Sequence, residues 1–73
     1  MQNFDPVFIE LRSIVVVTLR RAQCLVPVTS AELEAIRHIA TRSELLSAIN
    51  KAYMEHGIRG KALDQLNEVK KEL

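Results

Sequence analysis

Apolar residues recur at intervals of three and four along the stretch between Pro6 and Pro27. This spacing places them on one side of an α-helix for about five turns, at about 100° per residue. The residues on this arc are Phe4, Val7, Phe8, Leu11, Ile14, Val15, Leu19, Ala22, Leu25 and Val26. We therefore predict a helix over residues 6–24 and expect the arc to face a core.

Four β-branched residues in succession, at 14–17, are also typical of a β-strand. Residues 13–20, however, lack the alternation of a half-buried strand, since apolar side chains would then point to both faces. A fully buried strand could have this composition, but it would not explain the three-and-four spacing. Asp5 is a favoured N-cap and Pro6 a favoured first helical residue, whereas Pro27 prevents a smooth continuation.

Two capping-box spacings follow, at Thr29–Glu32 and Thr41–Glu44, and each predicts a helix start. If residues 30–56 formed one continuous helix, its apolar stripe would shift by about 160° part-way along. A helix that changes faces must break or bend, so we favour a break at 41–43. One bent helix remains the alternative.

The end of the third helix is predicted at Gly57, where a left-handed residue followed by the apolar Ile58 is typical of a helix C-cap. A last amphipathic helix follows. The predicted fold class is all-α, a small four-helix bundle formed by one domain over residues 1–73. Its helices are expected at about 6–24, 30–40, 43–56 and 61–72.

A chain of 73 residues is short for a self-sufficient core, which rarely supplies more than about 3–5 kcal/mol at this size. Cys24 is the only cysteine, so the chain cannot form an internal disulfide. Cys24, His38 and His56 lack paired ligand spacing, and no metal site is expected. Self-association or a partner protein is the remaining source of stability, and the bundle is expected to be oligomeric.

The charge balance is nearly even, with 10 Lys and Arg against 9 Asp and Glu. This gives no electrostatic footprint for nucleic acid or anionic lipid. The apolar runs are shorter than the ~20 residues of a membrane span. The N-terminus lacks a charged n-region with a cleavage site, and the single cysteine fits a reducing compartment, so a cytoplasmic location is expected.

Catalytic and cofactor motifs are not evident in the sequence. Nothing in the spacing of Cys24, His38 and His56 suggests a nucleophile with its base, and Gly57 and Gly60 do not make a phosphate loop. His38, four residues after Glu34, is interpreted as a solvated surface pair. The expectation is a protein that is not an enzyme and binds no cofactor.

The back of the first helix carries a second apolar ridge. Ile9 and Val16 lie one heptad apart and share this ridge with Arg12 and Arg20. A helix that is apolar on two sides is usually covered on both, which predicts Ile9, Arg12, Val16 and Arg20 as contact residues in a homodimer or with another protein. Scattered surface apolar residues are the ordinary alternative explanation.

The predicted function is therefore a small protein–protein interaction module, a regulator, adaptor or chaperone-like protein that acts by helix-face docking. The alternative is a helical DNA-binding or transcription-regulating domain, because the second and third helices have a helix-turn-helix outline. The outward face of the third helix argues against it, since it presents two carboxylates and one lysine to a phosphate backbone. Those outward residues are Ser43, Glu44, Ser47, Asn50, Lys51 and Glu55.

Overall fold

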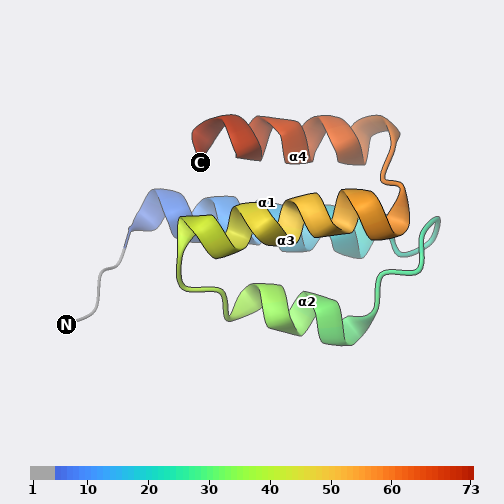
Figure 1. Cartoon of the computed structure of the whole chain (residues 1–73), viewed down its shortest axis with the longest axis horizontal. Helices are drawn as coiled ribbons and strands as arrows, with labels where there is room; N and C mark the ends of the chain where they lie inside the picture. The colour runs from blue at the N-terminus through green and yellow to red at the C-terminus, as the bar shows by residue number, and fades with distance from the viewer. Residues whose placement is uncertain (1–4) are drawn as a thin grey trace.

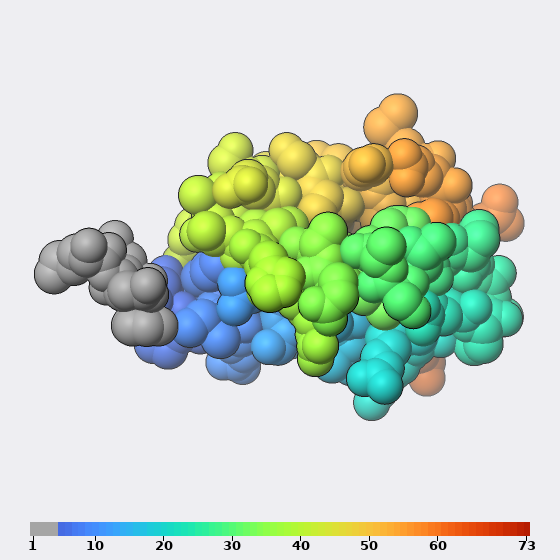
Figure 2. All heavy atoms as spheres, turned by 90° about the horizontal axis from the view of Figure 1, so that it is seen from below, coloured from blue at the N-terminus to red at the C-terminus, as the bar shows by residue number. Residues whose placement is uncertain are grey.

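The computed structural model describes residues 5–73, and within that range it is all-helical, as predicted. The four helices are α1 (Pro6–Ala22), α2 (Ser30–Arg37), α3 (Arg42–His56) and α4 (Gly60–Glu72). Helix α1 is central: α3 lies in front of it, with α4 and α2 on either side (Figure 1). Seen from the α2 side, α2 lies across the boundary between α1 and α3 (Figure 2).

Both ends of α1 follow from local hydrogen bonds. The Asp5 carboxylate accepts the backbone N–H groups of Val7 and Phe8 at 3.0 and 3.3 Å, which confirms the predicted N-cap. The helix ends at Ala22, two residues before the predicted end. The N–H groups of Leu25 and Val26 both donate to the Ala22 carbonyl at 2.9 Å, so the chain has already turned before Pro27.

Helices α2 and α3 are separate, and the break lies at residues 38–41, close to its predicted place. Thr29 and Glu32 form the complete capping box that starts α2. Helix α2 ends at Arg37, three residues early, because the N–H groups of His38 and Ile39 donate to carbonyls only three residues back. Thr41 caps α3 by accepting the Glu44 N–H at 3.2 Å, and α3 begins one residue earlier than predicted.

The turn between α3 and α4 depends on Gly57. Its φ of +59° is the left-handed conformation expected for a helix C-cap, and its N–H donates to the Tyr53 carbonyl at 3.0 Å. Ile58, the next residue, is buried. This reversal lays α4 antiparallel to α3 and beside α1 (Figure 1).

The core is continuous across all four helices. It contains Phe8, Leu11, Val15, Leu19, Val28, Leu33, Ile36, Leu45, Ile49, Ala52, Ile58, Leu66 and Val69. The buried arc of α1 is narrower than predicted, because Leu25 is 86% exposed beyond the end of the helix and Val7 is 51% exposed. Phe4, predicted to share that arc, lies outside the described residues.

Polar side chains join the helices at the rim of the core. Arg42 donates to the Asp5 carboxylate at 2.6 Å and to the Glu72 carbonyl at 3.2 Å, linking the ends of α1, α3 and α4. Its hydrogen bond to Asp5 holds the pKa of that carboxyl below its ordinary value. The Tyr53 hydroxyl donates to Asn67 of α4 at 2.8 Å, and burial raises the pKa of that phenol.

Candidate docking site

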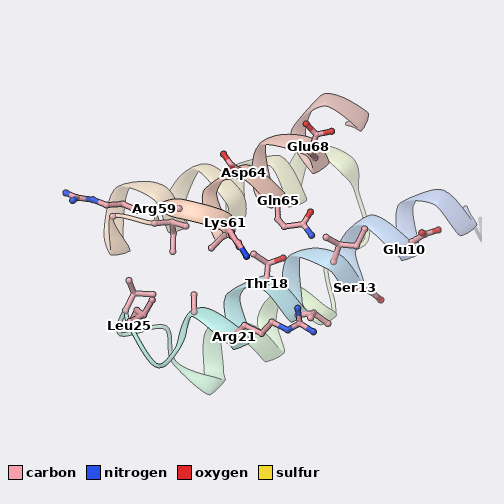
Figure 3. A pocket seen from close by; sticks show the side chains of 18 residues that line it. Glu10, Ser13, Thr18, Arg21, Leu25, Arg59, Lys61, Asp64, Gln65 and Glu68 are labelled. Carbon is pink, nitrogen blue, oxygen red and sulfur yellow. The ribbon is translucent and has the colours of Figure 1, made fainter.

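A groove with a volume of about 1100 Å³ lies between α1 and α4. Figure 3 shows the groove from close by, with α1 as one wall and α4 as the other. The loop after α1 and the turn before α4 close one end of it, where Leu25 and Arg59 lie (Figure 3). A groove between two helices is a geometry that accepts a third helix.

Apolar side chains from α1 and from the loop after it line the floor. Ile14 is half-buried, Val17 is 46% exposed, and Leu25 projects almost entirely into solvent at the end of the groove. Ala62 supplies a small apolar side chain from α4. Large apolar residues that stay open to water on a domain this small favour a surface that another molecule covers.

Charged side chains are sorted along the groove. Arg59 and Lys61 lie toward the end closed by the loops, and Arg21 extends from the last turn of α1 toward the middle, whereas Glu10 and Glu68 lie toward the opposite end (Figure 3). This separation follows from the antiparallel course of α1 and α4. It brings the basic last turn of α1 beside the start of α4.

Glu68 already has a partner, since Lys71 lies 3.3 Å from its carboxylate on the same helix. Asp64 lies between the two ends of the α4 wall (Figure 3). Glu10 is therefore the main negative charge at the acidic end, and it is opposite in sign to Arg59 and Lys61 at the other end.

The four contact residues predicted from the sequence lie on α1 outside the groove. Arg12 donates to the Ile39 carbonyl at 2.6 Å and lies over the Phe8 ring, so it links α1 to the end of α2. Val16 is half-buried and packs against the core. Ile9 and Arg20 are exposed. The structure thus places two of the four in contacts within the domain, and their role in binding a partner remains a prediction.

Sequence reasoning missed the groove, although part of its signal was visible. Ile14 and Leu25 belong to the arc that is predicted to face the core, whereas both line the groove. Seven residues of α1 line the groove, and four of them, at 10, 14, 17 and 21, recur as a helical stripe. Nothing in the local pattern says that α4 lies beside this stripe.

A second polar cluster joins α2 and α3. His56 is only 7% exposed, and its Nε2 lies 2.8 Å from Oε2 of Glu32, whose pKa is lowered chiefly by this hydrogen bond. Glu55 brings a third potential metal ligand, with all three ligand atoms within 4.8 Å of one another. Nε2, the imidazole nitrogen facing the carboxylates, already has Glu32 as its partner, so the geometry is that of an interhelical hydrogen bond.

The other reactive side chains are held locally. The exposed Cys24 thiol donates to the Arg21 carbonyl at 3.2 Å, and His38 lies 3.3 Å from Glu34, which matches the predicted surface pair. The predicted outward residues of α3 are all exposed. Within residues 5–73, none of the helices has the length and apolar character needed to cross a membrane.

Comparison of the chain with protein-family models, with curated proteins and with solved structures finds no match.

Proposed function

We propose that this protein is a non-enzymatic protein–protein interaction module that docks its partner in the groove between α1 and α4. The observation that carries the proposal is the open apolar floor of this groove, formed by Ile14, Val17 and Leu25. Covering such a floor removes apolar surface from water, which is the main driving force of protein association.

The shape and the rim of the groove support a helical protein partner. Two antiparallel helices present parallel walls, and charges of both signs surround an apolar strip, as in grooves that bind an amphipathic helix. Nucleic-acid binding requires a continuous basic surface. The rim of the groove is not one, because Glu10, Asp64 and Glu68 interrupt it. A reducing, cytoplasmic location is part of the proposal, since the free thiol of Cys24 is exposed.

The ridge of Ile9 and Arg20 remains a secondary candidate surface. We centre the proposal on the groove because Val16 and Arg12, the other two ridge residues, already contact the domain's own core and α2. A regulator, adaptor or chaperone-like role would each use the same docking step.

The test is affinity capture from a lysate of the native host, carried out with and without nuclease treatment, using three baits. They are the wild type, Val17→Glu in the groove, and Met54→Glu on α3. Met54 is the matched control because it is 87% exposed and does not line the groove. The proposal expects a stoichiometric protein that the wild type and Met54→Glu retain and Val17→Glu loses.

Two results would overturn the proposal. One is recovery of the same proteins with all three baits, which would separate binding from the groove. The other is recovery of nucleic acid alone, abolished by nuclease and steeply weakened by salt, which would support the DNA-binding alternative. Circular dichroism of each bait checks that the helices are intact.

A further inference from the structure

We propose that the occupant of the groove is the α1 helix of a second copy of this chain, packed antiparallel to the first about a twofold axis. The inference rests on the proposed function, because it names the partner of the same site. It is argued from the order of apolar and charged residues along the exposed stripe of α1.

The stripe reads Val7, Glu10, Ile14, Val17, Arg21 and then Cys24 with Leu25. Every member is exposed except Ile14, which is half-buried, and the residues from Glu10 to Arg21 line the groove. The spacing of three, four, three and four is that of a helix–helix seam. Glu10 and Arg21 lie at equal distances from the midpoint of this stripe and carry opposite charges.

The midpoint of the stripe falls between Val15 and Val16. At 1.5 Å per residue, Ile14 and Val17 lie about 2 Å on either side of it along the axis, and Glu10 and Arg21 lie about 8 Å on either side. An antiparallel copy therefore sets Ile14 against Val17 of its partner, and Glu10 against Arg21 of its partner, twice. A parallel copy would set like charges together instead.

The α4 wall fits the same arrangement. The antiparallel copy brings the N-terminal half of its α1, with its own Glu10, to the end of the groove where Arg59 and Lys61 lie (Figure 3). Isologous pairing makes both grooves equivalent, so each α1 fills the groove of the other chain.

The lining of the groove is open to a second copy. Fifteen of its eighteen residues are exposed or half-buried and can contact another chain. Such a dimer would also give α1 the cover that the domain's own α2, α3 and α4 leave incomplete.

The test uses charge reversal on the purified chain, with molar mass followed by sedimentation equilibrium from micromolar to millimolar concentration. The wild type should approach twice the 8.3 kDa monomer mass. Glu10→Arg alone and Arg21→Glu alone should each weaken the dimer about tenfold or more, since each places like charges together twice. The double variant restores opposite charges across the axis and should bind clearly more tightly than either single variant, short of the wild type because position 10 then faces Arg59 and Lys61 with a like charge.

Two further variants separate the floor from the rim. Val17→Glu puts a carboxylate beside the axis in both chains and should abolish the dimer, while Met54→Glu should leave it unchanged. Val17 is about half exposed, so the monomer should keep its helical circular dichroism with the substitution.

A wild type that stays monomeric at every concentration would overturn the inference, and so would a double variant that remains as weak as the single ones. Neither result would overturn the docking function, which is judged by groove-dependent capture of a different protein. A third outcome is a dimer that depends on the groove together with capture that recovers only further copies of this chain. It would support the inference, and the docking function would then be self-association.

Discussion

Nε2 of His56 lies 2.8 Å from Oε2 of Glu32, and this contact joins the last turn of α3 to the first turn of α2. The imidazole is almost completely buried, whereas Glu32 also accepts the N–H of Thr29 in its capping box. The carboxylate therefore has two structural roles, one within α2 and one between helices. His38 and Glu34 form the corresponding contact on the surface, 3.3 Å apart and largely exposed.

The two pairs allow a matched comparison of stability. Glu32→Gln should lower the free energy of unfolding by about 1 kcal/mol, because it replaces the charged partner of the part-buried His56 hydrogen bond by a neutral one. Glu34→Gln should change it by less than about 0.5 kcal/mol, since exposed pairs contribute little. Urea denaturation measures both. Equal effects would contradict the structural role assigned to the Glu32–His56 contact.

Acid should destabilise the fold through Asp5 and Glu32. Both pKa values are lowered in the folded state, Asp5 by its hydrogen bond to Arg42 and Glu32 by its hydrogen bond to His56, from ordinary values of 3.8 and 4.5. The unfolded chain therefore binds protons first. The contribution is fully present above about pH 4.5 and is lost as the pH falls through the lowered values.

Urea midpoints measured from neutral to strongly acidic pH test this dependence. The double variant Asp5→Asn/Glu32→Gln keeps an N-cap side chain but removes both titrating groups, so its stability should fall less steeply in acid. An unchanged slope below pH 4.5 would assign the acid sensitivity to other carboxyls.

Arg12 and Arg20 should behave differently although both were predicted as partner contacts. Arg12→Met removes the hydrogen bond to the Ile39 carbonyl and the stacking on Phe8, and should cost about 1–2 kcal/mol of stability. Arg20 is exposed, so Arg20→Met should be nearly neutral. Thermal or urea unfolding distinguishes the two. A neutral Arg12→Met would mean that its bond to α2 adds nothing to the fold.

Gly57 is a place where the backbone itself limits substitution. Gly57→Ala should destabilise the chain by about 1–2 kcal/mol, because a left-handed φ is costly for a residue with a Cβ. No neighbour lies within 4 Å of an added Cβ, so the loss is conformational rather than steric. Gly57→Asn should cost less, since asparagine tolerates this conformation. The urea midpoints of the two variants measure this difference. A Gly57→Asn variant less stable than Gly57→Ala would contradict the role assigned to the left-handed conformation.

The sequence by itself determined the four helices and most of their boundaries. Asp5, Thr29 and Thr41 cap helix starts, and Gly57 ends α3, because these signals act between residues no more than four apart. The apolar periodicity also selected a helix over a strand for residues 14–17. Such interactions are present wherever the segment lies in the fold.

Only the tertiary structure decided which sides of α1 are covered. Apolar residues occupy so much of its circumference that periodicity cannot say where α2, α3 and α4 pack, and so Leu25 was assigned to the core while it lies in the open groove. The contacts of Arg12 with Ile39 and of His56 with Glu32 join residues 27 and 24 positions apart. Such contacts exist only once the helices have packed, because nothing within a single turn of helix encodes them.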